Sequence, residues 1–448
     1  MKKETGAEVL RPRVHRRYGA AVPHYKSTEN RESTVMPPPD TVALLMQQHI
    51  GAPCKPTVKA GDAVKVGQVV GDSNEYIAAP IHASVSGTVK AIKQVMLPSG
   101  QWSEAVVIES DGKMEPFEGI RPPQAETREE LAQAARACGL VGLGGAGFPL
   151  HVKLSPPEGA KIDTLIINAA ECEPFITSDH REILENGENI LHGVYRLLTL
   201  LNVPRVVIAV EDNKPDAIGL LCRMAGDSRD IDNRVRVMRL RSRYPQGAEK
   251  VLIQSVTGRK VPQGGLPSDA GCIVMNVTTV GKLADYLKTG MPLVSKRITV
   301  EGSAVRSPQN VIVPLGTSVR DVIGFCGGYR RRPGKILMGG PMMGLALIDD
   351  EMPVLKQNNA ILAFARRDAL LPREEPCIRC GRCVRACPMS LMPTVLERYA
   401  RAGNAQGLRA YGVNSCMECG SCAYVCPAHR NLVQQMRLGK EQLRKAGQ

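Results

Sequence analysis

The chain has 448 residues, of which 43% are hydrophobic and 4% are aromatic, and its formal net charge is +14. This length predicts about three to four domains, and no apolar run approaches the ~18 residues that a membrane-spanning helix needs. The N-terminus carries charges with no hydrophobic stretch behind them, so we expect no secretory signal. These features argue against an integral membrane protein and favour a soluble or peripheral protein of the reducing cytoplasm.

The basic residues gather near both ends of the chain, in residues 1–34 and 366–448. Such an excess suits an acidic redox partner or an anionic membrane surface. The low aromatic content and the lack of a recognition motif argue against nucleic acid. The sequence also lacks G-x-S-x-G, P-loop and H-E-x-x-H motifs, so nothing supports a hydrolase or an ATPase.

The first predicted segments are a polar arm and a small β domain. Residues 1–34 are irregular, and we expect this arm to dock on another surface. Residues 35–112 alternate apolar and polar positions in short runs broken by glycine, which predicts strands. The pattern G-D-x-V-x-x-G-Q at 61–68 resembles barrel-sandwich domains that carry biotin or lipoate on a lysine. The corresponding tip, DSNEYIAA at 72–79, has no lysine, so we expect a structural or docking module.

Residues 120–265 read as an α/β domain. Thr127 and Glu130 form a capping box that predicts the start of a helix. Buried strands are then expected at 164–167, 205–210 and 235–240, with helices between them. This alternation predicts a mainly parallel sheet, whose ligands bind at the carboxyl ends of the strands.

Residues 272–350 return to short β segments, with one helix and a tail rich in glycine and methionine at 338–344. Methionines in such a tail are more often packing residues than ligands. We expect a connector from there to about residue 365. It leads into a last domain at 366–448.

Eight cysteines in the last domain form two groups that each read C-x₂-C-x₂-C-x₃-C-P. This is the run that binds cubane clusters in bacterial ferredoxins, where the fourth cysteine ligates the cluster of the other group. We therefore predict two [4Fe–4S] clusters. The first would be bound by Cys377, Cys380, Cys383 and Cys426, and the second by Cys416, Cys419, Cys422 and Cys387.

Zinc and disulfides are the alternatives for these cysteines. Zinc sites use C-x₂-C pairs without a third cysteine at a second x₂ step. Disulfides require an oxidising compartment, which nothing in the sequence indicates. Cluster binding makes the chain an electron carrier or an electron-transfer enzyme.

Two loops in the α/β region are candidate ligand sites. Residues 142–147 match G-x-G-x-x-G, but a helix precedes them, so the ordinary dinucleotide motif fails on context. Glycines still let the backbone approach a phosphate or a flat ring; a plain helix–strand turn is the alternative. The second loop, NAAECEP at 168–174, follows a buried strand. The candidate cofactor-binding residues are Gly142, Gly144, Gly145, Gly147, Lys153, Asn168, Glu171 and Glu173.

The two loops carry a family resemblance. GLGGAGFP with its following lysine, NAAECEP and D-x-R resemble the flavin- and NADH-binding core of the complex I flavoprotein subunit. Leu143, Ala170 and Cys172 depart from that subunit and resemble instead the RnfC family of Rnf electron-transport complexes. That family is also matched by QHIGAP at 48–53, YPQG-x-EK at 244–250, GGLP at 264–267 and MGGPMMG at 338–344. Residues 18–26 match the family's opening motif only loosely, and Leu150 replaces a threonine.

The resemblance implies a multidomain α/β and α+β fold. Its order would be a barrel-sandwich domain, a flavin/NADH domain, a β-grasp (SLBB-like) domain and a two-cluster ferredoxin domain. It also implies that NADH reduces FMN, which passes single electrons to the clusters. The glycines would admit the flavin, Lys153 would add charge at its phosphate, Asn168 and Glu171 would hold it, and Glu173 would contact the nicotinamide ribose. Cys172 is more simply a packed thiol than a redox residue.

Three functions stay open at this point. The chain could be the peripheral RnfC subunit of an Rnf-type ion-translocating ferredoxin:NAD⁺ oxidoreductase on the inner face of the cell membrane. It could be a cytosolic or microcompartment flavin/iron–sulfur reductase, as in PduS-like cobalamin reductases, which share the same modules. It could also be an electron wire without flavin. Expected partners are other redox subunits of such a membrane complex or an acidic, ferredoxin- or flavodoxin-like protein.

Overall fold

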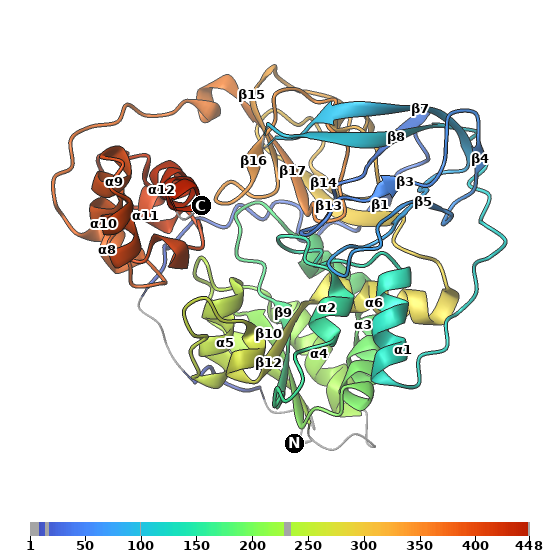
Figure 1. Ribbon diagram of the computed structural model, residues 1–448, viewed down its shortest axis with the longest axis horizontal. Coiled ribbons are helices and arrows are strands. Elements are labelled where there is room, and N and C mark those ends of the chain that lie inside the picture. Colours follow the sequence, from blue (N-terminus) through green and yellow to red (C-terminus); the bar gives the residue numbers. More distant parts are fainter. Residues whose placement is uncertain (1–8, 14–17, 99, 228–233, 447–448) are drawn as a thin grey trace.

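The computed structural model describes residues 9–13, 18–98, 100–227 and 234–446, so parts of the predicted arm and the last two residues lie outside it (Figure 1). The described chain forms several domains of mixed helices and strands. Within it, no helix is both long and apolar enough to cross a membrane.

Two small antiparallel sheets make up the first domain. One has the order β2-β8-β7-β4, and the other has the order β3-β5-β6. The alternation of small, glycine-broken apolar runs thus folds as a sandwich of short strands, as predicted. The bounds are β2 (Thr41–Leu45), β3 (Lys55–Pro56), β4 (Ala63–Val64), β5 (Val69–Asp72), β6 (Ile81–His82), β7 (Gly87–Met96) and β8 (Trp102–Ser110).

A four-stranded parallel sheet, in the order β11-β10-β9-β12, is the centre of the α/β domain. Strands β9, β10 and β12 are mostly apolar and buried on both faces, as strands inside a parallel sheet require, whereas the edge strand β11 carries two arginines. The strands are β9 (Thr164–Ala169), β10 (Arg205–Glu211), β11 (Val235–Leu240) and β12 (Cys272–Asn276). The helices are α1 (Arg128–Ala137), α2 (Leu150–Leu154), α3 (Ser178–Leu200), α4 (Pro215–Asp227), α5 (Glu249–Thr257) and α6 (Val277–Thr289), with the 3₁₀ turn η1 (Pro267–Ala270).

The predicted boundary of this domain at residue 265 is wrong. Strand β12 was assigned to the following β-rich domain, but it pairs in parallel with β9, Ile273 opposite Leu165. Helix α6 then packs on α3. A five-residue apolar run carries no information about which sheet it joins, so the sequence could not place β12. The Thr127–Glu130 capping box is present as predicted and begins α1.

The next sheet has six strands in the order β1-β14-β13-β17-β15-β16. It extends beyond the predicted range of 272–350 on both sides, because β1 comes from the end of the arm and β17 lies in the supposed connector. Strand β17 is central, between β13 and β15. The bounds are β1 (Thr34–Val35), β13 (Ser295–Glu301), β14 (Gln309–Pro314), β15 (Pro333–Met338), β16 (Leu345–Ala346), β17 (Ala360–Ala365), α7 (Val319–Phe325) and the 3₁₀ turn η2 (Arg366–Ala369).

A small helical domain at the C-terminus carries both cysteine groups. In Figure 1 it lies to the left of the other domains and is reached by an extended linker that follows η2. Its own apolar core includes Leu396, Leu408 and Met436. Its elements are α8 (Arg382–Ala386), α9 (Pro393–Arg401), α10 (Ala405–Ala410), the 3₁₀ turn η3 (Val413–Ser415), α11 (Ser421–Tyr424) and α12 (Leu432–Ala446).

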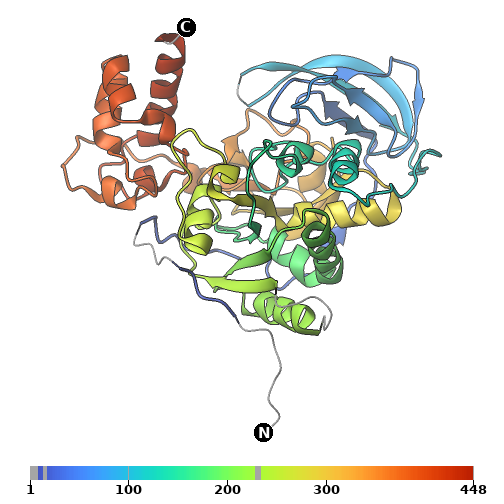
Figure 2. The same cartoon turned by 60° about the horizontal axis from the view of Figure 1, so that its bottom comes forward.

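The described part of the N-terminal arm docks on its own chain. Leu10 lies beside Met238 at the edge of the parallel sheet. The arm then runs along the α/β domain toward the cluster domain (Figure 2). Farther on, the buried Lys26 ammonium donates to the carbonyls of Glu171, Glu173 and Ile176. The arm thus holds the loop that follows β9.

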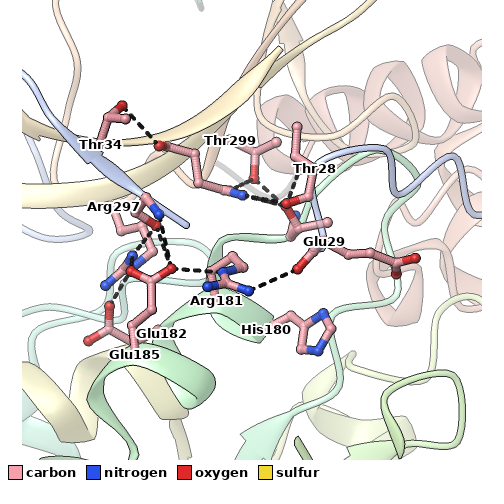
Figure 3. Close-up of polar contacts among 12 residues, drawn as sticks. Thr28, Glu29, Thr34, His180, Arg181, Glu182, Glu185, Arg297 and Thr299 are labelled. Atoms are coloured by element: carbon pink, nitrogen blue, oxygen red, sulfur yellow. Dashed lines mark hydrogen bonds and ion pairs between the residues drawn. The ribbon is translucent and has the colours of Figure 1, made fainter. Parts of the chain in front are cut away.

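A buried polar network joins the arm, α3 and the six-stranded sheet (Figure 3). Arg297 Nε of β13 donates to Glu182 Oε2 at 2.8 Å, and both side chains are almost fully buried, at 6% and 3% exposed. The same guanidinium donates to Glu185 and Ser33. Arg181 bonds Glu185 in turn at 2.7 Å. The network therefore sets how the β-grasp sheet packs on the α/β domain.

Removing Arg297 alone should be costly. Arg297→Met leaves the Glu182 carboxylate buried without its partner, and we expect the free energy of unfolding to fall by about 3–5 kcal/mol. The loss would be measured by urea denaturation of the apo-protein followed by circular dichroism. The double variant Arg297→Met/Glu182→Leu should recover much of it. Arg320→Met, which breaks an ion pair of a guanidinium that is 59% exposed, should cost less than about 1 kcal/mol. Equal losses in the buried and exposed variants would contradict this account.

Candidate functional site

The glycine loop, residues 142–147, turns back on itself between α1 and α2. The N–H of Gly142 donates to the carbonyl of Phe148 at 2.9 Å and closes the turn. The N–H of Leu143 donates to the hydroxyl of Thr279 in α6 at 3.1 Å. These bonds hold the loop over the carboxyl end of the parallel sheet.

The middle of the loop presents bare backbone. Gly144, Gly145 and Ala146 are exposed, and the N–H groups of Gly144 and Gly145 donate to no other described residue. A Cβ atom at Gly144 would lie 2.4 Å from Asn276 Nδ2, so only glycine allows this close approach. Gly147 has a φ of +72°, a conformation that favours glycine. The loop can therefore bring free N–H groups to an anionic ligand.

Two asparagines lie opposite each other at the carboxyl ends of neighbouring strands. Asn168 is the second-last residue of β9, and Asn276 is the last residue of β12. Asn168 Nδ2 donates to the carbonyl of Gly247 at 2.8 Å. Asn276 Nδ2 donates to Asp179 Oδ2 at 2.7 Å. Sequence reasoning missed Asn276, although CIVMN at 272–276 repeats the pattern of TLIIN at 164–168. The repeat of an apolar run closed by asparagine was the available signal.

Lys153 reaches the same edge from α2. Its Nζ donates to Glu249 Oε2 at 2.8 Å and to the carbonyl of Val274 at 3.2 Å. The structure thus brings together the glycine loop, Lys153 and Asn168, and adds Asn276 and Glu249. Free backbone N–H groups, an ammonium and two amide ends are groups that suit a phosphate and the polar edge of a ring. The residues present fit FMN.

Glu171 has a different task from the one expected. Its carboxylate accepts the N–H of Asp179 at 2.7 Å and the hydroxyl of Ser178 at 3.3 Å, and it is buried. Glu171 therefore caps the N-terminus of α3, where a negative charge is favourable. Its oxygens are occupied within the protein, so we expect it to support the loop rather than to bind flavin.

Glu173 ties the glycine- and methionine-rich loop to this site. Its carboxylate accepts the N–H groups of Met342 and Met343, each at 3.0 Å. Burial raises the pKa of Glu173 to about 7. Cys172 lies between Glu171 and Glu173 in the sequence. Its sulfur accepts a hydrogen bond from the N–H of Gly247 at 3.4 Å, and burial raises the pKa of its thiol. Cys172 is thus a packed thiol, as the sequence suggested.

The eight cysteines of the cluster domain lie near one another in two sets that exchange their fourth members. Cys387, Cys416, Cys419 and Cys422 line one hollow together. Burial, with the nearby thiols of Cys416, Cys419 and Cys387, raises the pKa of Cys422. The fourth cysteine of the first sequence group therefore lies with the second group.

The fourth cysteine of the second sequence group, Cys426, lies in turn with the first group. Burial, with the nearby thiols of Cys426 and Cys377, raises the pKa of Cys383. Among the described residues, no three side chains of His, Cys, Asp or Glu converge on a point that could hold a single metal ion. Thiols spread around a hollow suit a cubane, in which each iron takes one cysteine, rather than one zinc ion.

The cluster domain docks on the α/β domain through the second cysteine group. The buried hydroxyl of Tyr244 donates to the carbonyl of Cys419 at 2.6 Å. The N–H of Gly19 in the arm donates to the carbonyl of Ala386 at 3.1 Å. A Cβ atom at Gly420 would lie 3.0 Å from the carbonyl oxygen of Met342. The second group therefore faces the carboxyl edge of the sheet that also carries the glycine loop.

Comparisons with known proteins match each domain. A family model described as the Nuo51 FMN-binding domain matches residues 135–285, past the wrongly predicted boundary. The RnfC barrel sandwich hybrid domain matches residues 14–113, and an SLBB domain matches residues 297–346. A 4Fe-4S dicluster domain matches residues 376–430. These matches confirm the predicted fold class and cofactors, FMN and [4Fe–4S] clusters.

Curated relatives cover nearly the whole chain. The RnfC-type subunit of the proton-translocating ferredoxin:NAD(+) oxidoreductase complex of Clostridium ljungdahlii is 42% identical over 94% of this chain and 92% of its own. The Na(+)-translocating counterpart from Acetobacterium woodii is 40% identical over 90% and 91%. This chain belongs to the RnfC family. That membership confirms the predicted Rnf resemblance and favours it over the soluble cobalamin reductases.

Another RnfC-type protein, from the ion-translocating oxidoreductase complex of Rhodobacter capsulatus, is 38% identical over 94% of this chain and 81% of its own. Among solved structures, an NAD+-reducing [NiFe]-hydrogenase in the H2-reduced state has a TM-score of 0.52 at 18% identity. The match covers 71% of this chain and 62% of that chain. It shows a shared fold alone.

Iron counting in double variants tests the crossed ligand groups. Cys387→Ala/Cys416→Ala removes two ligands of one cluster, so about four irons per chain should remain. Cys387→Ala/Cys383→Ala removes one ligand from each cluster, and little iron should remain. Iron and sulfide would be measured after anaerobic reconstitution. The opposite pattern would mean that each sequence group binds its own cluster.

The Tyr244 hydroxyl should hold the cluster domain in place. Tyr244→Phe removes a hydrogen bond worth about 1 kcal/mol, so opening of the contact should become about fivefold more frequent. We expect hydrogen exchange at residues 416–422 to rise accordingly while iron content is unchanged. Tyr411→Phe, an exposed tyrosine of the same domain, is the control. Exchange at 416–422 that is equal in both variants would show that Tyr244 does not hold the interface.

Proposed function

We propose that this chain is the peripheral RnfC subunit of an ion-translocating ferredoxin:NAD⁺ oxidoreductase complex. It would act on NAD(H) as an oxidoreductase and exchange electrons with the other redox subunits at the inner face of the cell membrane. The names of the curated relatives support this proposal. The observation within the chain that carries it is the direct hydrogen bond from Tyr244 of the α/β domain to the backbone of the cluster ligand Cys419.

The site residues have the following proposed tasks. Gly142, Gly144, Gly145 and Gly147 would bind the flavin phosphate through backbone N–H groups, and Lys153 would neutralise part of its charge. Asn168 and Asn276 would position the ring edge, supported by Glu171 behind them. Glu173 would hold the loop at 338–344 beside the nicotinamide ribose.

Bound FMN supplies the conversion between two-electron and one-electron chemistry. The protein contributes geometry. The glycine loop allows a close approach, and the hydrogen bond from Tyr244 keeps the second cysteine group at the same edge of the sheet. Cys416, Cys419, Cys422 and Cys387 would hold the nearer cluster. Cys377, Cys380, Cys383 and Cys426 would hold the farther one.

We also propose domain limits that follow the strands. Residues 35–112 would form the barrel-sandwich domain and residues 120–290 the flavin domain. The β-grasp domain would run from 295 to 365 with β1 added, and the cluster domain from 366 to 448. The arm, residues 1–34, would belong to the interfaces between them.

The visible spectrum decides whether electrons enter from NADH. The chain would be purified without oxygen, reconstituted with iron, sulfide and FMN, and mixed with NADH. We expect the flavin bands to bleach first and the cluster absorbance to fall afterwards. The dehydrogenase function would be contradicted if the chain bound no flavin and its clusters were reduced by dithionite but not by NADH.

A glycine pair provides the matched control for this experiment. Gly144→Ala places a methyl group against Asn276 and should abolish flavin binding while iron content stays the same. Gly324→Ala adds the same group where nothing lies within 4 Å, and it should change neither flavin binding nor iron content.

The chain, produced together with the membrane subunits, should sediment with membranes at low salt. A chain that stays in solution there would contradict the proposed place in a membrane complex.

A further inference from the structure

The two cysteine groups differ in exposure. The group predicted to bind the second cluster consists of Cys416, Cys419, Cys422 and Cys387. Of these, Cys387, Cys419 and Cys422 are buried, and the group lies against the α/β domain. In the first group, Cys377 and Cys380 are both exposed. A partner that approaches from outside therefore meets the first cluster, at the ligand loop between Cys377 and Cys380.

Three arginines lie within that ligand loop or directly after it. Arg379, Arg382 and Arg385 are exposed, and none of them forms an ion pair with any residue in the described ranges. Four other basic side chains of the same domain are paired with carboxylates. Arg401 and Arg430 pair with Glu374 and Glu397, and Arg437 and Lys440 pair with Glu418.

An apolar side chain sits at the centre of the loop. Ile378, between Cys377 and Arg379, is 67% exposed. A central apolar contact with a charged rim is the usual composition of a protein interface. A reduced cluster with four thiolates is itself anionic and would repel an acidic carrier. The unpaired arginines make the surface that such a carrier meets positively charged.

We propose that residues 377–385, here called the exit face, are the docking surface for an acidic one-electron carrier protein of ferredoxin or flavodoxin type. The inference rests on the proposed electron-transfer function and adds the place and the chemistry of the partner. Weak redox encounters of this kind bury little surface and rely on charge to raise the association rate. In each encounter one electron moves between the carrier and the first cluster. One centre is oxidised and the other reduced, and no bond or proton is exchanged.

The test uses the full chain with its clusters reconstituted and a small acidic two-cluster ferredoxin as the carrier. The ferredoxin is photoreduced and mixed with oxidised chain in a stopped-flow instrument, so NADH is not involved. Binding of the two proteins is measured in parallel by calorimetry. Failure of the NADH experiment therefore leaves this one interpretable, and the reverse also holds.

Two double variants carry the same change in charge. In Arg379→Gln/Arg382→Gln, both the association rate and the binding constant should fall about tenfold near 20 mM ionic strength. The difference from the unmodified chain should shrink to less than about twofold near 0.5 M, where salt screens the charges. Arg398→Gln/Arg409→Gln, on α9 and α10 of the same domain, should stay within about twofold throughout.

Three results would overturn the proposal. Equal effects of the two double variants would show that only net charge matters. A salt-independent fall in rate, with a shifted potential of the first cluster in an EPR titration and unchanged binding, would mean that the arginines tune the cluster. A loss of binding to phosphatidylserine vesicles, with unchanged binding to ferredoxin, would make the exit face a membrane contact.

Discussion

The hydrogen bond from Tyr244 to the carbonyl of Cys419 is the contact on which the electron path through this protein depends. The cluster domain has its own core and is joined to the rest by an extended, exposed linker after η2 (Figure 1). Covalent connection therefore does not set its position. A neutral hydrogen bond contributes only about 1 kcal/mol to stability. Its value here lies in geometry, because it anchors the backbone of a cluster ligand to the segment that follows β11.

The N-terminal arm supports the loop after β9 at this same edge of the sheet. The Lys26 ammonium is buried, and burial lowers its pKa even though Glu171 lies nearby. It is satisfied by three backbone carbonyls of the loop after β9. A buried cation with fewer partners would carry a large desolvation cost. The loop that carries Glu171 and Glu173 is thus held in one conformation by a residue far away in sequence.

Features that depend on spacing within one segment could be predicted from the sequence. The spacing of the eight cysteines predicts cluster binding, because a cubane takes three ligands from one short turn. The same motif predicts the crossed fourth ligand. In the structure Cys387 lies with Cys416, Cys419 and Cys422, and Cys426 lies near Cys383. The capping box before α1 and the parallel strands β9, β10 and β11 were also readable, since each depends on local residues or on regular alternation.

Features that depend on distant pairing could not be predicted in this way. Strand β12 and strand β17 are short apolar runs, and such runs fit any sheet until their partners are known. Glu171 looked like a ligand because it follows a strand, but it caps a helix that begins several residues later. The arm was expected to dock, but the sequence could not name its partners, because Tyr244, Ala386 and Asn310 lie hundreds of residues away.

The two cluster sites differ in the surroundings that act on the cluster potentials. Around the second group, the N–H groups of Glu418 and Leu391 donate to Cys416 and Cys387 at 3.4 and 3.3 Å. Such bonds favour the reduced, more negative cluster, whereas burial disfavours it. The first group receives a bond from Arg379 N–H to Cys377 at 3.4 Å, and it gains water and guanidinium charge from its exposure. Each site thus offsets part of the cost of added negative charge. Backbone donors serve both sites, but one site is buried, whereas the other adds solvent and arginine at the surface where a partner would meet it.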